Sequence, residues 1–173
     1  MSHAAAPHEQ HRRRGPASVA CYVVTSSRSR TEADDEGGRL VREALERAGH
    51  RVVGQRIVRD DEMELRRIAA TEAAHAGAQA LIVTGGTGLS PHDRTIEALE
   101  PLWTRRLPGF GELFRQLSFA EVGSAAMLSR AAAGAVGSLF VVALPGSPSA
   151  VRLALEKLVL PELGHAVGLL GDG

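Results

Sequence analysis

The sequence predicts an α/β domain of three layers, in which a mostly parallel sheet lies between helices. Short apolar segments typical of buried strands alternate along the chain with segments of helical periodicity, as in a parallel sheet covered on both faces. The length of 173 residues suits one domain, and no internal repeat divides it. We therefore expect one domain over residues 18–173, preceded by a disordered tail over residues 1–17.

The predicted strands share a short apolar run that is bounded by polar or turn residues. The third of them is almost entirely apolar, as expected for a central strand that is covered on both faces. The strands are expected at residues 19–25, 51–58, 78–84 and 138–144.

The predicted helices share apolar side chains that recur on one face. The second helix is expected to begin at Asp60 or Asp61, because Asp61 and Glu64 have the spacing of a capping box. The last helix is expected to break or bend near Pro161, since proline removes a helical hydrogen bond. Helical segments are expected at about 40–48, 61–73, 95–102, 108–118, 124–133 (with a weaker pattern) and 148–170.

Composition excludes several classes of protein. Twenty Lys and Arg residues balance twenty Asp and Glu residues, so charge gives no reason to expect nucleic acid or a membrane surface as a partner. No apolar stretch approaches the roughly 18 residues of a membrane helix, and the N-terminal residues lack the apolar segment of a signal peptide. Cys21 is the only cysteine, which fits a reducing, cytoplasmic location and a buried thiol.

The segment TGGTGLSPHD, residues 84–93, directly follows the third predicted strand. Ligands of open α/β sheets bind at the carboxyl ends of the strands, and glycines there let backbone N–H groups approach phosphate oxygens. The threonine hydroxyls add further donors. A plain tight turn would explain one or two of the glycines, and neither the P-loop nor the dinucleotide-binding pattern is present. The segment therefore favours a phosphate-binding loop of another kind.

Two aspartates at the same edge of the sheet suggest a metal ion. A carboxylate would repel bound phosphates unless a cation lay between them, and Mg²⁺ is usually bound by one or two carboxylates together with substrate phosphates. Asp93 ends the glycine-rich segment, and Asp60 follows the second strand. Each could also cap the helix after it, and the two roles are compatible. His92 is expected to be a solvated loop residue, because phosphoryl chemistry depends mainly on positioning and charge neutralisation.

The segment LPGSP, residues 144–148, follows the fourth predicted strand. Its prolines fix a rigid turn around Gly146, and Ser147 can offer its hydroxyl to a ligand or cap the last helix. Two glycine-bearing turns at strand ends favour a ligand cleft more than either turn alone. Ser129 and Arg130 are weaker candidates: an arginine beside a serine is usually on the surface, but it can also pair with phosphate.

Four segments, in this order and spacing, resemble the MogA/MoaB family of molybdenum cofactor biosynthesis proteins. They are TGGTGLSPHDRT, PGFGELFRQLS, GSAAMLSRAAAG and LPGSPSAV. The similarity runs from about residue 18 to the end of the chain. It implies the molybdopterin-binding (MogA-like) α/β fold, assembled as a homotrimer or a hexamer, with the molybdenum-insertion protein as a candidate partner.

The resemblance implies a molybdopterin adenylyltransferase. In that reaction the terminal phosphate of molybdopterin attacks the α-phosphorus of ATP, giving adenylyl-molybdopterin and pyrophosphate, with Mg²⁺ as cofactor. Asp60 and Asp93 would then be both the catalytic and the metal-binding residues. The nucleotide- and pterin-binding residues would be Thr84, Gly85, Gly86, Thr87, Gly88, Ser129, Arg130, Pro145, Gly146, Ser147 and Pro148.

The alternative is a non-catalytic molybdopterin-binding or assembly protein of the MoaB type. The segments RTEADDEGG and PGFGELFRQLS lean towards the MoaB branch, some members of which lack the first aspartate and are thought to bind without catalysis. This chain keeps Asp60, or else Asp61, which favours an active enzyme. The first strand ends in TSSRSR, with Arg28 where the family commonly has an acidic residue, so its ligand contacts do not follow from the resemblance.

Overall fold

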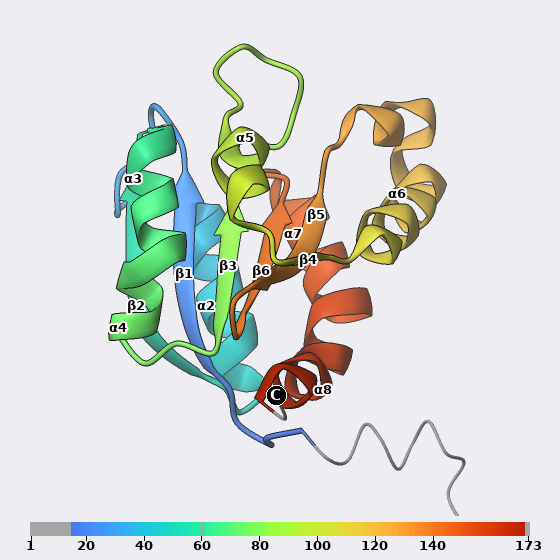
Figure 1. Cartoon of the computed structure of the whole chain (residues 1–173). Helices are drawn as coiled ribbons and strands as arrows, with labels where there is room; N and C mark the ends of the chain where they lie inside the picture. The colour runs from blue at the N-terminus through green and yellow to red at the C-terminus, as the bar shows by residue number, and fades with distance from the viewer. Residues whose placement is uncertain (1–14, 60, 172–173) are drawn as a thin grey trace, which may run out of the picture.

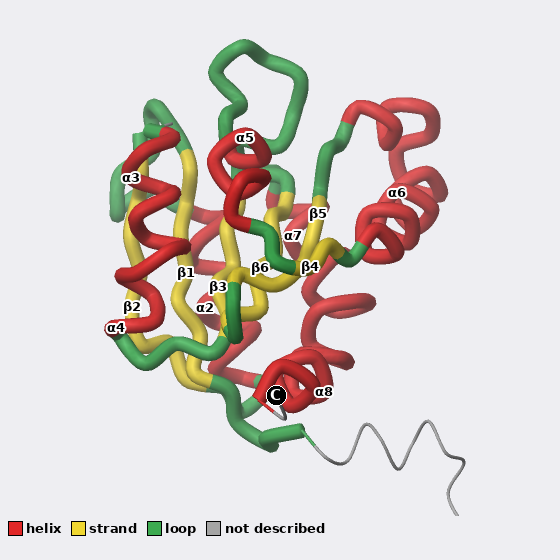
Figure 2. The backbone as a smooth tube through the Cα atoms, in the orientation of Figure 1, coloured by secondary structure: helices red, strands yellow, loops and turns green. Residues whose placement is uncertain are grey.

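A computed structural model describes residues 15–59 and 61–171. Within these residues, six strands form one sheet in the order β2-β1-β3-β6-β5-β4, with helices on both faces (Figures 1 and 2). The first four strands of this order are parallel, whereas β5 pairs antiparallel with both β6 and β4. The predicted three-layer fold with a mostly parallel sheet is therefore confirmed.

All four predicted strands are present, and their bounds differ from the expected ones by at most two residues. The strands are β1 (Ala20–Ser26), β2 (Arg51–Val58), β3 (Ala80–Thr84), β4 (Arg105–Arg106), β5 (Ala132–Val136) and β6 (Leu139–Leu144).

The helix expected over residues 124–133 was wrong. A 3₁₀ helix covers Gly123–Leu128, and β5 follows it. Alanine favours helices only weakly compared with tertiary pairing, and here the small side chains let the strand lie close to its neighbours. A Cβ atom at Gly134 would lie 2.8 Å from the ring of Trp103 and 2.4 Å from the Arg105 carbonyl oxygen. The segment is therefore a tightly covered strand of the sheet.

The remaining helices lie close to their predicted places, and two of them contain π-helical turns. The turn Leu155–Val159 joins α7 to α8 directly before Pro161, where a bend was expected, and Ile68–Glu72 joins α3 to α4. The α-helices are α2 (Glu36–Arg47), α3 (Glu62–Arg67), α4 (Ala73–His75), α5 (Thr95–Leu99), α6 (Pro108–Val122), α7 (Pro148–Ala154) and α8 (Leu160–Gly171).

The central strand β3 divides the apolar core into two parts. Its alternate side chains point to opposite faces, so Ile82 packs with α2 and the C-terminal helices, while Leu81 and Val83 pack with α3 and α5. Every residue of β3 is buried, as expected for a central strand. Cys21 is also buried, and burial raises the pKa of its thiol to about 12, so it remains a protonated core residue. No helix among the described residues is long and apolar enough to cross a bilayer.

Tyr22 forms a polar contact at the edge of the core. Its phenol donates a hydrogen bond of 2.5 Å to Glu72, which also pairs with Arg56 and Arg67. The hydrogen bond from Tyr22 is the main cause that lowers the pKa of Glu72 to about 2. Gly54 leaves room for the ring, since a Cβ atom there would lie 2.4 Å from Tyr22 Cε2.

Replacing Tyr22 by phenylalanine is expected to lower the free energy of unfolding by about 1 to 2 kcal/mol at neutral pH. A carboxylate with a lowered pKa stabilises the fold above its unfolded pKa of about 4.3, and this contribution is lost as the pH falls through the folded value. The difference in unfolding free energy between Tyr22→Phe and the unaltered protein should therefore become smaller as the pH falls from about 4 towards 2. Urea unfolding of both proteins across this pH range measures the difference in unfolding free energy. A difference that stays constant with pH would contradict the prediction.

Candidate functional site

A cavity of about 520 Å³ lies at the carboxyl ends of the central parallel strands. The segments after β1, β3 and β6 surround it, and Ser129 joins them from the approach to β5. Along the sheet, β2 lies on one side of β1 and β3 lies on the other, so the chain order switches between β1 and β3. Open α/β sheets bind ligands at such a switch point. The lining comprises residues 26–28, 85–88, 90, 92–93, 129 and 145–147.

The glycine loop, residues 84–88, turns its carbonyl groups into the protein. The carbonyl oxygens of Gly85 and Gly86 accept hydrogen bonds from the Thr95 hydroxyl at 2.8 Å and the Thr95 N–H at 3.0 Å. Those of Thr87 and Gly88 accept from the Arg130 N–H at 2.9 Å and from Arg130 Nε at 2.8 Å. All the carbonyl oxygens of residues 85–88 are thus engaged by two residues.

Unlike the carbonyl groups, most of the N–H groups of residues 85–88 have no hydrogen-bond partner among the described residues. That of Gly85 donates to the Leu144 carbonyl oxygen at 2.9 Å and so fixes the loop to the end of β6. Among the described residues, the N–H groups of Gly86, Thr87 and Gly88 donate to no acceptor. Three successive backbone donors at a cavity wall can bind the oxygens of an anion.

Glycine is required in this loop for steric reasons. Gly85 has a φ of 93°, and a Cβ atom there would lie 2.2 Å from the Ser26 carbonyl oxygen. Gly86 has a φ of 66°, and a Cβ atom there would lie 2.4 Å from Thr95 Oγ1. Both positions therefore combine a left-handed backbone with a close neighbour.

The second glycine turn lies against the first. A Cβ atom at Gly146 would be 3.3 Å from the Cα atom of Gly85. The Thr84 hydroxyl donates to the Pro145 carbonyl oxygen at 3.0 Å, so fully buried Thr84 connects the two turns and does not line the cavity. Ser147 precedes α7 but makes no side-chain capping bond, and it lines the cavity. Pro148 is the first residue of α7 and lies outside the lining.

Asp93 lines the cavity beside the glycine loop. Its carboxylate accepts a hydrogen bond from the Ser90 N–H at 2.9 Å, and it does not cap α5. A Cβ atom at Gly88 would lie 2.7 Å from Asp93 Oδ2, so the carboxylate is next to the backbone of the loop. The structure thus places a carboxylate directly beside the candidate phosphate-binding groups.

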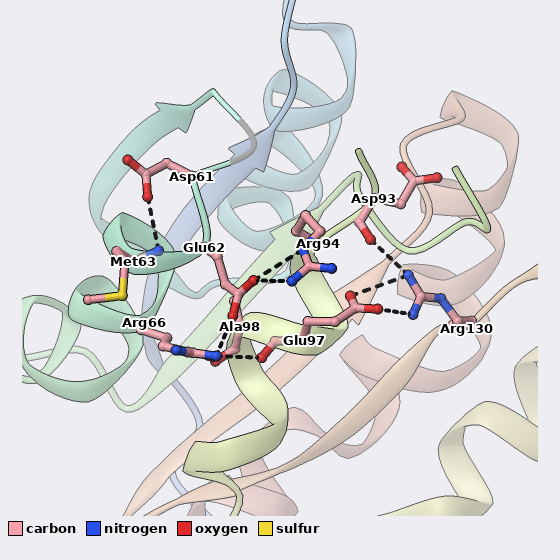
Figure 3. Close-up of polar contacts among 9 residues, drawn as sticks. All are labelled: Asp61, Glu62, Met63, Arg66, Asp93, Arg94, Glu97, Ala98 and Arg130. Atoms are coloured by element: carbon pink, nitrogen blue, oxygen red, sulfur yellow. Dashed lines mark hydrogen bonds and ion pairs between the residues drawn. The ribbon is translucent and has the colours of Figure 1, made fainter. Parts of the chain in front are cut away.

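The choice between Asp60 and Asp61 as a helix cap is also clear. Asp61 is the N-cap of α3, because its carboxylate accepts hydrogen bonds from the N–H groups of Met63 at 2.9 Å (Figure 3) and Glu64 at 3.1 Å. Asp60, predicted as a catalytic and metal-binding residue, lies outside the described residues. The described residues contain no group of three or more His, Cys, Asp or Glu side chains suited to a metal ion.

Arg130 has a different position from the one expected. It was a candidate for pairing with phosphate, but it is not among the lining residues. Its guanidinium donates to the carbonyl oxygen of Gly88. It also donates to the carbonyl oxygen of Asp93 and the carboxylate of Glu97 (Figure 3). Ser129, its neighbour, does line the cavity.

Part of the lining was not predicted from the sequence. Ser26, Ser27 and Arg28 reach the cavity because β1 lies beside β3, and Ser90 reaches it from the loop of Asp93. Arg28 is exposed and, among the described residues that line the cavity, is the one arginine or lysine. His92 is exposed as expected, and it also lines the cavity. The position of TSSRSR after a predicted strand was the available signal for the β1 residues.

The chain is similar to proteins of molybdenum cofactor biosynthesis. Residues 20–165 match the family described as "Probable molybdopterin binding domain". Molybdenum cofactor biosynthesis protein B of Bacillus subtilis (strain 168) is 43% identical over 160 residues, which cover 92% of this chain and 94% of that protein. A crystal structure of a molybdenum cofactor biosynthesis protein B has a TM-score of 0.86 and 44% identity, covering 91% of this chain and 99% of the other. The tungsten cofactor synthesizing protein MoaB from Pyrococcus furiosus has a TM-score of 0.78 and 38% identity, covering 87% and 95%.

Substitution of Gly85 by alanine is expected to be far more damaging than the same change at another glycine with positive φ. Gly137 has a φ of 59°, but a Cβ atom there would meet nothing within 4 Å. We expect Gly137→Ala to cost about 1 kcal/mol of unfolding free energy and Gly85→Ala about 3 kcal/mol or more. Chemical denaturation of the two variants measures the difference. Equal losses would show that the contact with Ser26 does not constrain the loop.

Proposed function

The chain belongs to the molybdopterin-binding family of molybdenum cofactor biosynthesis proteins, and we propose that it transfers the adenylyl group of Mg·ATP to molybdopterin. An oxygen of the terminal phosphate of molybdopterin attacks the α-phosphorus of ATP. The bond between the α-phosphorus and the bridging oxygen to the β-phosphorus breaks, and pyrophosphate leaves. The products are adenylyl-molybdopterin and pyrophosphate.

The glycine loop carries this proposal. The free N–H groups of Gly86, Thr87 and Gly88 are fixed in place because the carbonyl groups of residues 85–88 are all engaged. Such donors need no reorganisation when they bind phosphate, which is the property that favours phosphoryl-group chemistry. Arg28, on the wall formed by the end of β1, adds a positive charge for the phosphates of either substrate. The cavity of about 520 Å³ falls in the size range of ordinary small-molecule sites.

Asp93 is the described residue best suited to hold Mg²⁺. Its carboxylate lies beside Gly88, so a cation bound there would also face phosphates on the loop. We propose Asp60 as the second ligand, because it follows β2 and precedes the cap of α3. The ion would supply charge neutralisation for the phosphates and the departing pyrophosphate. The protein's own part is to hold the carboxylates and backbone donors in fixed positions.

The second candidate function is binding of molybdopterin without catalysis. Two observations favour it: the relatives compared above carry the names biosynthesis protein B and MoaB, and Arg28 follows β1 where the resembled family commonly has an acidic residue. Under this function the glycine loop would hold the pterin phosphate, but ATP would not be consumed. The two functions therefore differ in pyrophosphate release.

Replacing Asp93 by asparagine is expected to lower the rate of adenylyl transfer by about 100-fold or more, because the amide cannot neutralise Mg²⁺. Asp60→Asn should have a similar effect. Asp61→Asn is the matched control, since asparagine caps a helix as well as aspartate does. The measurement is pyrophosphate release and adenylyl-molybdopterin formation from molybdopterin and Mg·ATP.

Two results would change the assignment. If the unaltered protein binds molybdopterin but releases no pyrophosphate, the non-catalytic function is correct. If Asp61→Asn loses activity and Asp60→Asn keeps it, the metal ligand at the start of α3 has been assigned to the wrong residue.

A further inference from the structure

We propose that Arg130 is a positioning residue, which clamps the loop of residues 88–93 and thereby sets the place of the Asp93 carboxylate. The consequence for metal binding rests on the proposed function, in which Asp93 binds Mg²⁺. The clamp itself rests on contacts of the described residues alone.

One guanidinium joins the two ends of this loop. Arg130 Nε donates to the Gly88 carbonyl oxygen at 2.8 Å, and Nη2 donates to the Asp93 carbonyl oxygen at 2.9 Å. The backbone N–H of Arg130 binds the Thr87 carbonyl oxygen at 2.9 Å, so the contact extends into the glycine loop. A planar guanidinium can bridge several acceptors in fixed directions, whereas a lysine ammonium on its flexible stem cannot reproduce this geometry.

Glu97 holds the guanidinium from the other side. Arg130 Nη1 lies 2.6 Å from Glu97 Oε1, and Nη2 lies 3.4 Å from Oε2. The hydrogen bond from Arg130 is the main cause that lowers the pKa of Glu97, so this carboxylate is charged at neutral pH. Glu97 belongs to α5, whose first residue, Thr95, binds the carbonyl oxygens of Gly85 and Gly86. The clamp is therefore anchored to the same helix that fixes the glycine loop.

Among the described residues, little else fixes the position of residues 88–93. Residues 89–92 are exposed, and Leu89 is 68% exposed, so no apolar side chain anchors the segment to the core. The loop extends beyond the sheet at the top of Figure 1. Hydrogen bonds between Ser90 and Asp93 fold the loop on itself, but they do not tie it to the rest of the protein. The Arg130 contacts at Gly88 and Asp93 supply that connection.

The direction of the Asp93 side chain agrees with this role. Figure 3 shows the Asp93 carbonyl oxygen directed at Arg130, while the carboxylate points away from the guanidinium. Arg130 therefore holds the backbone of Asp93 and leaves the carboxylate available at the cavity. Groups that orient a metal ligand commonly change metal affinity or activity by about 10-fold to 100-fold when they are removed.

The test compares Arg130→Ala, Arg130→Lys and Glu97→Gln with Arg56→Ala. The control removes an arginine whose ion pairs with Glu64 and Glu72 lie outside the cavity lining. Three quantities are measured: Mn²⁺ affinity by electron paramagnetic resonance in the presence of a non-hydrolysable ATP analogue, the Mg²⁺ dependence of pyrophosphate release, and amide hydrogen exchange of residues 88–93. Thermal unfolding of each variant reports general loss of stability.

We expect Arg130→Ala and Arg130→Lys to weaken Mn²⁺ binding by about 10-fold or more, to raise the half-saturating Mg²⁺ concentration equally, and to speed exchange in residues 88–93. Glu97→Gln should change all three in the same direction but less, because an amide oxygen can still accept a hydrogen bond. Arg56→Ala should change none of them, even where it lowers the unfolding temperature.

Two outcomes would overturn the clamp. If Arg130→Lys matches the unaltered protein in exchange and Mn²⁺ affinity, the bridging guanidinium is not needed. If Arg130→Ala weakens molybdopterin or ATP binding while exchange in residues 88–93 stays unchanged, Arg130 acts as a phosphate ligand instead. Should the unaltered protein release no pyrophosphate, the adenylyl transfer fails, and hydrogen exchange still decides the clamp.

Discussion

The arrangement of the site depends on the direction in which the glycine loop turns its peptide groups. Thr95 and Arg130 together donate hydrogen bonds to all the carbonyl oxygens of residues 85–88, and Gly85 is fixed to the end of β6. This leaves N–H groups at the cavity wall without any charged side chain being needed there. A ligand rich in phosphate oxygens is the natural complement of such a wall. The positive φ values of Gly85 and Gly86 and the contact with Ser26 follow from the same arrangement.

The sheet brings the other parts of the site to this loop. Because β1, β3 and β6 are adjacent and parallel, the segments that follow them meet at one edge. Helices α3 and α5 are held together by charged contacts: Glu62 pairs with Arg94 at 2.6 Å, and Arg66 binds the Glu97 carbonyl oxygen at 3.1 Å (Figure 3). The start of α3, which follows Asp60, is thus connected to the helix that supports Asp93. The cap of α3 and the segment that contains Asp93 are therefore held in a fixed relation to each other.

Much of this could be predicted from the sequence because it depends on local patterns. The apolar runs gave four strands, and the segment TGGTGLSPHD after the third strand gave the position of the cavity. The segment before β6 could not be predicted, because its alanines favour a helix locally and only pairing with β6 and β4 makes it a strand. The structural role of Arg130 could not be predicted either, because its partners Gly88 and Glu97 lie 42 and 33 positions away in the sequence. Arg28 and its neighbours line the cavity because β1 lies beside β3 in the sheet, and local sequence patterns do not show this strand order.

Transfer of the adenylyl group, as opposed to binding alone or transfer of another phosphoryl group, is the central claim of this account. Incubating the protein with molybdopterin, Mg²⁺ and ATP labelled in parallel at the α- or the γ-phosphorus tests it most directly. We expect label from the α-phosphorus to appear on molybdopterin and label from the γ-phosphorus to appear only in pyrophosphate. Label from the γ-phosphorus on the pterin, or no label on it from either position, would contradict the account.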